Sequence, residues 1–220
     1  MNIIWDKLFK KRDWGKYPPE DLIRFIKRLK KNTKIKKKLK ILEIGCGPGA
    51  NLNFLKNEDL DIYGIDISKT AINKSMKILS FKTNENNKFK VGDFSNLPWE
   101  NDYFDCVIDN FSVYANTNKV IKKTYFEVHR VLKKNGSFFS KVWGTKTLGY
   151  KSGKKIEKGT YNKIKFGPCK NMGISHFFEY SELKRLNNIF NYNQIDRHFY
   201  TDKYLCKNYF AEVFISISKK

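Results

Sequence analysis

The sequence predicts one α/β domain, in which helices cover both faces of a mostly parallel sheet of seven strands. Three observations lead to this fold class. A chain of 220 residues, 40% of them hydrophobic, is long enough to bury a full core without disulfides or a metal. Short apolar runs alternate with segments of helical periodicity, as crossover connections between parallel strands require. One of these runs ends in a cluster of glycines, which suits the ligand-binding edge of an open α/β sheet.

The elements in the first half of the chain follow from local patterns. Pro19 and Glu20 suit the first turn of a helix, and the apolar residues that follow them recur on one face. Ser68 is a suitable N-cap for a further helix with an apolar stripe. The same half is expected to contain strands at 39–44, 62–65, 89–91 and 104–108, and a helix at 50–57.

The second half contains one long helix and one long interruption. The helix is expected at 118–133, because Asn135 and Gly136 form a typical stop signal after lysines in a last turn. Residues 144–180 are polar, rich in lysine and punctuated by glycines, and so long a connection is usually a functional or a disordered loop. The remaining elements are strands at 137–143, 192–200 and 209–218, and a helix from Ser181 to about Phe190.

The composition favours a soluble cytoplasmic protein with reduced cysteines. No run approaches the roughly 20 apolar residues that cross a bilayer, and the N-terminus lacks a secretory signal pattern. The four cysteines are scattered without CxxC spacing, so the sequence predicts no metal site and no redox pair. They are Cys46, Cys106, Cys169 and Cys206. Nothing in the sequence indicates the oligomeric state.

The net charge of +22 draws attention to nucleic acid as a partner. However, only six of the 44 basic residues are arginine, the residue whose planar fork suits phosphate and base recognition. Abundant lysine, asparagine, isoleucine, phenylalanine and tyrosine is also typical of proteins from AT-rich genomes. Nucleic acid therefore stays an alternative partner and not the favoured one.

The first strand runs directly into the sequence EIGCGPGA at 43–50. Glycines allow the sharp turn and the close approach of backbone to a ligand that such a loop needs. The spacing Gly45-x-Gly47-x-x-Ala50 also satisfies the dinucleotide fingerprint. The loop alone therefore does not separate a nicotinamide or flavin enzyme from a methyltransferase.

The segments around this loop resemble the motifs of class I S-adenosylmethionine-dependent methyltransferases, in order and at similar spacing. The segments are ILEIGCGPGANLNFL, YGIDIS, VGDFSNLPWENDYFDCVIDNFSVY and VLKKNGSFF, within residues 39–143. The likeness is greatest to the small-molecule group that includes ubiquinone and menaquinone methyltransferase-like enzymes. It implies a Rossmann-like three-layer sandwich with an antiparallel last strand, S-adenosylmethionine as cofactor and S-adenosylhomocysteine as product.

The resemblance also implies roles for residues at consecutive strand ends. Glu43 would hold the cationic methionyl end of the cofactor, and Asp66 both ribose hydroxyls. Asp93 would accept from the adenine amine while Phe94 covers the ring. The full expected cofactor set is Glu43, Gly45, Cys46, Gly47, Asp66, Ile67, Asp93, Phe94, Asn110 and Tyr17.

The rest of the single domain is expected to surround the methyl acceptor. In similar enzymes a leading segment folds over the cofactor, so 1–38 is read as a lid and helix, followed by the cofactor-binding core at 39–143. Residues 144–180 then form the substrate loop region, and 181–220 a C-terminal helix and strands. Trp14 and Tyr114 are expected to line the acceptor pocket. If a general base is used, His176 is the candidate, because it lies at the end of the substrate loop region.

The expected reaction is in-line methyl transfer to a small molecule such as a sugar, an amine or a quinone precursor. Asp109-Asn110-Phe111-Ser112 stands where a Pro-Pro-Tyr motif marks enzymes that methylate DNA bases or glutamine, which disfavours those acceptors. Three alternatives stay open. They are an RNA-directed methyltransferase, a non-catalytic subunit that binds S-adenosylmethionine, and a nicotinamide oxidoreductase.

Overall fold

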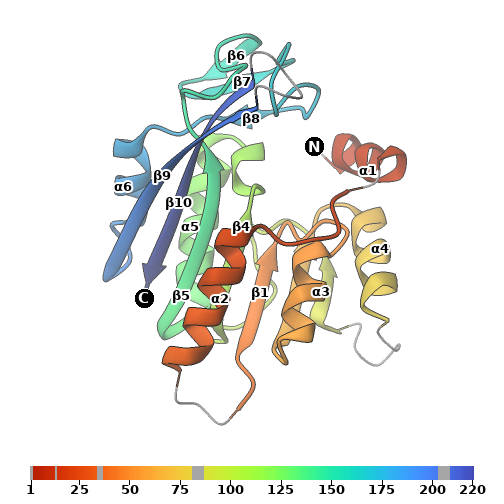
Figure 1. The fold of residues 1–220 in the computed structure, drawn as a ribbon, viewed down its shortest axis with the longest axis vertical. Coiled ribbons are helices and arrows are strands. Elements are labelled where there is room, and N and C mark those ends of the chain that lie inside the picture. The colour runs from red at the N-terminus through yellow and green to blue at the C-terminus, as the bar shows by residue number, and fades with distance from the viewer. Residues whose placement is uncertain (1, 13, 34–36, 81–86, 203–208) are drawn as a thin grey trace.

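The computed structural model describes residues 2–12, 14–33, 37–80, 87–202 and 209–220 (Figure 1). A seven-stranded sheet crosses the molecule in the order β3-β2-β1-β4-β5-β10-β9. Its parallel part consists of β1 (Lys40–Ile44), β2 (Asp61–Asp66), β3 (Phe89–Val91), β4 (Phe104–Asn110) and β5 (Leu132–Trp143). The last strand, β10 (Tyr209–Lys219), runs antiparallel between β5 and β9 (Tyr192–Asp202). The predicted fold class, with its antiparallel last strand, is confirmed.

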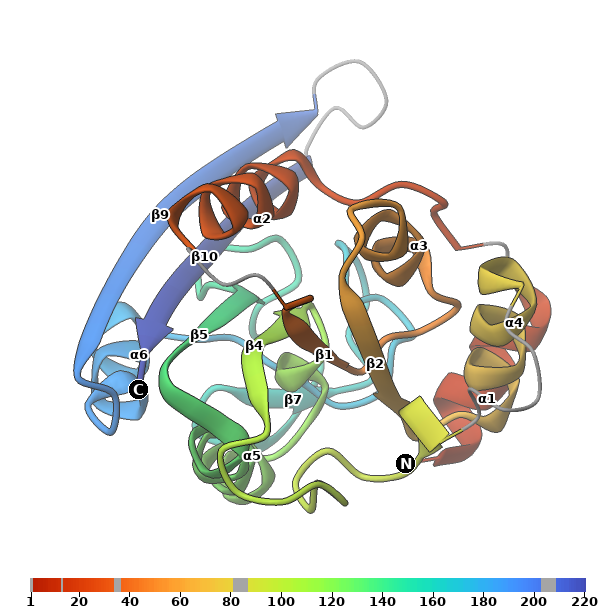
Figure 2. The same ribbon diagram turned by 90° about the horizontal axis from the view of Figure 1, so that it is seen from below.

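Helices cover both faces of the sheet (Figure 2). One face is covered by α2 (Glu20–Asn32) and α3 (Ala50–Asn57), and α4 (Lys69–Leu79) packs beside β2 and β3. The other face is covered by α5 (Asn118–Val131) and α6 (Tyr180–Asn187). Strand residues alternate between two buried clusters, with Leu42 and Val107 facing α5 and Ile41 and Ile108 facing α2 and α3.

The strand order places a ligand-binding edge between β1 and β4. The chain runs outward from β1 to β2 and β3, and then returns to the opposite side of β1 at β4. At such a reversal the loops that leave neighbouring strands diverge, so a crevice forms at the carboxyl ends of those strands. The predicted glycine loop lies at this point. Ser68 caps α4 as expected, since its Oγ accepts a hydrogen bond from the Ala71 N–H at 3.1 Å.

Two further parts of the chain lie at the same end of the sheet (Figure 1). One is α1 (Asn2–Lys11), which packs against α4. The other is a small antiparallel sheet within 144–178, made of β6 (Lys154–Glu157), β7 (Thr160–Asn162) and β8 (Ser175–His176). A bridge between Gly144 and Phe178 closes the base of this insertion. The segment expected to be a loop is therefore built around its own sheet.

The boundary between α5 and β5 differs from the expected one. The helix ends at Val131 instead of 133, and Asn135 and Gly136 belong to the long strand β5. Asn135 adopts a left-handed φ of 65°, and its N–H donates to the carbonyl of Lys220 at the chain end. Both residues lie between Leu132 and Ser137, which pair with β4, and the Lys220 N–H donates to the carbonyl of Gly136, so the strand includes the turn. None of the described helices is long and apolar enough to cross a membrane.

Candidate functional site

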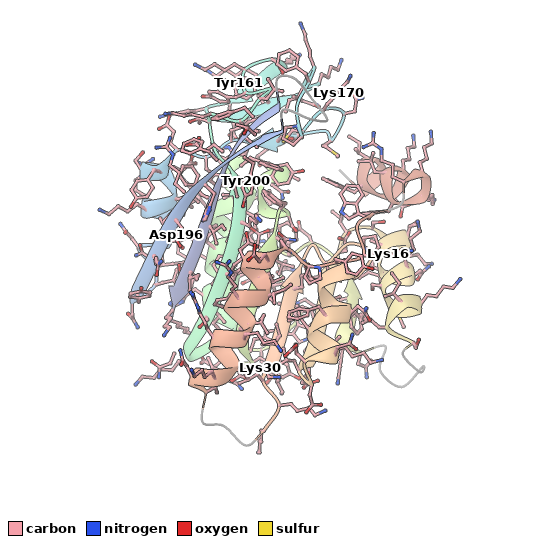
Figure 3. All side chains as sticks on the ribbon, in the orientation of Figure 1. Lys16, Lys30, Tyr161, Lys170, Asp196 and Tyr200 are labelled. Atoms are coloured by element: carbon pink, nitrogen blue, oxygen red, sulfur yellow. The ribbon has the colours of Figure 1, made fainter. Side chains whose placement is uncertain are left out.

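A cavity of about 500 Å³ opens at the carboxyl ends of the parallel strands, within the roughly 300 to 1,000 Å³ of small-molecule sites. Its floor is the glycine loop and the ends of β2, β3, β4 and β5. Its two sides are α1 with the segment that follows it, and the insertion at 144–178. Figure 3 labels one lysine from each side, Lys16 and Lys170. The cavity therefore joins segments that lie far apart in the sequence.

The glycine loop leaves β1 in a conformation that only glycine adopts readily. Gly45, Gly47 and Gly49 have φ values of 61°, 53° and 93°, all in the left-handed region. A Cβ on Gly45 would also overlap Cβ and Oγ of Ser112, which follows β4. The Cys46 N–H donates to the carbonyl of Ile65 at 3.1 Å, so the loop is fixed to β2. Burial raises the pKa of the Cys46 thiol, which leaves the backbone as the functional part of this residue.

Asp66 connects the end of β2 to the glycine loop. Its Oδ2 accepts a hydrogen bond from the Gly47 N–H at 2.9 Å, and its Oδ1 accepts from the Ser68 N–H at 2.8 Å. Burial raises the pKa of this carboxyl, and the two backbone donors oppose that rise. Each oxygen keeps a second lone pair, so the carboxylate can still accept from a ligand. Ile67 follows it in the cavity wall.

Glu43 carries a buried oxygen that needs a donor. Its Oε1 accepts from Asn51 Nδ2 at 2.6 Å, whereas Oε2 is buried and has no partner among the described residues. Burial raises the pKa of Glu43 to about 8, with Asp109 and Asp66 adding repulsion. A cation beside Oε2 would stabilise the ionised carboxylate. This position therefore favours a cationic ligand group.

The raised pKa of Glu43 predicts a pH dependence of folding. An exposed glutamate titrates near 4.5, so between pH 4.5 and about 8 the folded protein holds a proton that the unfolded chain has lost. The free energy of unfolding should therefore fall as pH rises through this window. Glu43→Gln should remove this part of the slope, measured by urea denaturation from pH 5 to 8. The exposed Glu100→Gln is the control, and an unchanged slope in Glu43→Gln would contradict the assignment.

The ends of β3 and β4 supply the remaining predicted residues. Asp93 lies just after β3, where its Oδ1 accepts from the Ser95 N–H at 2.8 Å, and Phe94 faces the cavity. Asn110 at the end of β4 has a buried Oδ1 with no partner among the described residues. All ten residues of the expected cofactor set line this cavity. Within the described chain, no cluster of three or more His, Cys, Asp or Glu side chains could hold a metal.

Asp109 is a buried residue of this site to which sequence reasoning gave no role. Its Oδ1 accepts from the N–H groups of Ser112 and Val113, at 2.8 and 3.0 Å, and its Oδ2 accepts from Ser140 Oγ at 2.7 Å. Burial raises the pKa of Asp109 to about 6. The carboxylate holds the loop after β4 in the shape that forms one cavity wall. The sequence feature that could have pointed to this role is an aspartate at the end of a predicted strand, three residues before a serine.

His176, the expected base, is not brought to the cavity. Its side chain is fully buried in the insertion. Its Nδ1 lies 2.8 Å from Thr160 Oγ1 and its Nε2 lies 3.1 Å from Glu182 Oε2, so both ring nitrogens have partners. The ring also packs edge-on against Phe178. The residue fixes the insertion to α6 and has no free nitrogen for an acceptor. Tyr114, by contrast, lines the cavity.

The amino-terminal lip of the cavity is aromatic, and the carboxylate of Asp6 helps to anchor α1 to the start of α4. Asp6 Oδ1 accepts from Ser68 Oγ at 2.7 Å and from the Thr70 N–H at 3.0 Å. Trp5, Phe9 and Trp14 form a cluster with ring centroids 5.2 to 6.2 Å apart. Trp14 and Tyr17 also line the cavity on this side, and Tyr17 is 87% exposed. The sequence did not predict the helix or the anchor.

Comparisons with known proteins agree with this architecture. A family model described as a methyltransferase domain matches residues 35–194. An uncharacterised protein of Methanocaldococcus jannaschii is 30% identical over 193 residues, which cover 87% of this chain and 71% of that protein. An uncharacterised methyltransferase of Schizosaccharomyces pombe is 41% identical over 70 residues, 31% of this chain and 47% of that protein. A S-adenosylmethionine-dependent methyltransferase of Methanosarcina mazei shares the fold, with a TM-score of 0.68 at 20% identity over 93% of this chain and 98% of that one.

Proposed function

Because this chain belongs to the class I S-adenosylmethionine-dependent methyltransferases, we propose that its cavity binds the donor beside a small-molecule acceptor and aligns the two for methyl transfer. One observation carries the proposal. The glycine loop, Glu43, Asp66, Asp93 and Asn110 line a single cavity with room for more than one ligand group. A nicotinamide oxidoreductase is excluded by the family.

The residues present fit the donor. Two buried acceptor atoms, Glu43 Oε2 and Asn110 Oδ1, have no partner among the described residues, and the ammonium group of a methionyl moiety supplies the donors that they need. In this proposal Asp66 holds the ribose hydroxyls. Asp93 and Phe94 hold adenine, and Ile67 packs beside it. The backbone of Gly45, Cys46 and Gly47 approaches the donor closely, since no side chain projects from the two glycines.

The protein contributes alignment and exclusion of water. S-adenosylmethionine supplies a methyl group activated by a positively charged sulfur. The chain's part is to hold the two reactants close and in line, which lowers the entropic barrier. Trp5, Phe9 and Trp14 on one lip and Met172 on the other reduce the access of water to the cavity. In this proposal the requirement is alignment of the two reactants, so no proton acceptor needs to be assumed.

Small-molecule acceptors are favoured by the shape of the site. The cavity is bordered by α1 on one side and by the insertion on the other (Figure 1). A ubiquinone-like subgroup, suggested by the motifs, is one such class of acceptor, and sugars and amines are others.

A cytoplasmic location is part of this proposal. Cys46, Cys106 and Cys169 are free and buried, which suits the reducing cytoplasm.

RNA is the second candidate acceptor, because the net charge is +22. It predicts retention on RNA that weakens steeply with salt, since each phosphate contact releases counterions. Weak retention at 50 mM salt that is unchanged at 200 mM would dismiss RNA as the acceptor.

A non-catalytic subunit is the remaining alternative. Saturable binding of S-adenosylhomocysteine without transfer to any acceptor would support it.

Asp66→Ala should weaken S-adenosylhomocysteine binding by about 1–3 kcal/mol, the range for hydrogen bonds that involve a charge. Titration calorimetry measures the dissociation constant directly. Because Asp66 also fixes Gly47, the sharper comparison uses 2′-deoxy-S-adenosylhomocysteine. The wild type should lose affinity with this analogue, and Asp66→Ala should bind both ligands equally. A variant that still discriminates between them would remove Asp66 from the ribose role.

A further inference from the structure

The part of the cavity wall that is not assigned to the donor contains no proton acceptor among the described residues. It is formed mainly by Phe111, Tyr114, Ala115, Val120, Trp143 and Met172. Tyr114 is the ionisable residue of this wall, and burial raises its pKa well above that of free tyrosine. It is therefore neutral at pH 7 and acts as a hydrogen-bond donor. The neighbouring polar residues, Ser112 and Asn116, do not titrate.

The carboxylates and the histidine nearest to this wall already have hydrogen-bond partners or are assigned to donor binding. Asp109 accepts three hydrogen bonds that hold the loop after β4. Both ring nitrogens of His176 have partners, Thr160 in the insertion and Glu182 on α6. Glu43, Asp66 and Asp93 are assigned to the donor. An acceptor that must lose a proton during transfer would find no described side chain to take it.

The insertion at 144–178 is unusually basic. It contains eight lysines and one acidic residue, Glu157, so its net charge of +7 in 35 residues is twice the average density of the chain. Glu157 accepts from the backbone of Asn118 and from Thr160 Oγ1, and is not paired with a lysine. The segment also supplies Pro168 and Met172 to the cavity wall. The positive electrostatic potential of the insertion therefore extends to the opening of the cavity.

Exposed lysines stand on both sides of the opening (Figure 3). Exposed Lys165 and Lys170 lie three residues before and two residues after Pro168 in the sequence of the insertion, and exposed Lys16 lies between Gly15 and Tyr17 on the opposite side. Opposite charge on an incoming ligand raises its local concentration at such an opening. The lysines thus favour an anionic ligand, while the wall behind them is apolar.

The apolar wall favours a reaction in which charge disappears. Phe111 and Trp143 stack with ring centroids 4.1 Å apart, and Tyr114 packs edge-on against both. Opposite charges attract more strongly where water is excluded. Neutral products also pay a smaller free-energy cost than charged products when they are transferred from water to an apolar environment. A sulfonium donor and an anionic acceptor that give two neutral products therefore suit this wall.

We propose that the methyl acceptor is a carboxylate on a small molecule with an apolar or aromatic body, and that the product is its methyl ester. The inference rests on the proposed function and specifies the substrate class. A carboxyl group titrates near pH 4 and is an anion at pH 7, whereas alcohols, ammonium groups and most thiols still hold their proton. Among these groups, the carboxylate is thus the one that needs no base and is also an anion.

The transfer step balances without a proton. A lone pair of the carboxylate oxygen forms the new O–CH₃ bond as the S–CH₃ bond breaks, and the electron pair of that bond goes to sulfur. The negative charge of the acceptor and the positive charge of the sulfonium disappear together. The Tyr114 hydroxyl and the Asn116 amide are the neutral donors on this wall that can orient the acceptor.

The first test compares acceptors with one body and different nucleophiles. Phenylacetate and decanoate are offered with a methyl-labelled donor, alongside 2-phenylethanol, phenethylamine and benzyl mercaptan. With the donor at saturating concentration, we expect label that mild alkali releases as methanol, from the carboxylates alone, with a rate that is flat from pH 6 to 9. Transfer to the other nucleophiles instead, or to no carboxylate, would overturn this inference. Failure of S-adenosylhomocysteine to bind would overturn the proposed function, so the two failures are distinguishable.

The second test measures acceptor binding without the donor. Trp5, Trp14 and Trp143 line the cavity, so quenching of tryptophan fluorescence reports phenylacetate binding. The triple variant Lys16→Gln, Lys165→Gln, Lys170→Gln should weaken binding about fivefold at low salt and less at 0.5 M salt. The matched control is Lys37→Gln, Lys77→Gln, Lys134→Gln, which removes the same charge at the opposite end of the sheet. Equal weakening in the two triple variants would contradict a role for the lysines at the opening.

Discussion

Asp109→Ala should lower the free energy of unfolding by about 3–5 kcal/mol, because it leaves three donors without a partner, two of them in buried bonds, and each unpaired buried donor costs roughly 1–3 kcal/mol. The donors are the N–H groups of Ser112 and Val113 and the hydroxyl of Ser140. The loop that loses these bonds carries Phe111 and Tyr114, so donor and acceptor binding should weaken with stability. Urea denaturation at pH 7 and calorimetry with S-adenosylhomocysteine measure the two effects.

Two controls separate the carboxylate from the volume of the side chain. Asp109→Asn keeps the size and one acceptor oxygen, and should lose about 1–2 kcal/mol because the two backbone donors keep a partner. Ser140→Ala removes one donor together with its need for a partner, and should cost about 1 kcal/mol. If Asp109→Ala were no worse than Ser140→Ala, the loop would be held by its other contacts.

The sheet was predictable because its strands are short apolar runs with turn and loop residues at their ends. Parallel strands buried on both faces leave a continuous apolar signal in the sequence, as at Ile41–Leu42 and Val107–Ile108. The end of α5 was not predictable in the same way. Asn135 and Gly136 are turn residues, and β5 continues through them because Leu132 and Ser137 on either side pair with β4, while their own backbone bonds to that of Lys220. That pairing is a property of the tertiary structure.

The residues of the candidate site also fall into a group that local sequence predicts and a group that depends on tertiary contacts. Residues at strand ends were predictable, because the glycine loop, Asp66 and Asp93 follow apolar runs and converge at one edge of the sheet. Residues that act through non-local contacts were not. The α1 anchor is Asp6, which bonds to Ser68 and Thr70 more than 60 residues away. His176 was misjudged for the same reason, since its partners Thr160 and Glu182 lie on other elements.

Gly45→Ala should abolish measurable donor binding, with an expected loss of at least about 3 kcal/mol, or over a hundredfold in dissociation constant. Two independent costs add. A non-glycine residue at a φ of 61° costs about 1–2 kcal/mol. The new Cβ would also overlap Cβ and Oγ of Ser112, so either the glycine loop or the loop after β4 must move. Both loops line the cavity, and a displacement of either disturbs it.

A double variant tells the two costs apart. Gly45→Ala combined with Ser112→Gly removes the overlap and keeps the backbone cost, so it should recover about half of the lost binding free energy. Gly15→Ala is the matched control at the opening of the same cavity, because nothing lies within 4 Å of its Cβ position. It should bind S-adenosylhomocysteine like the wild type. If the double variant bound no better than Gly45→Ala, backbone conformation alone would fix the loop, and contact with the loop after β4 would carry none of the effect.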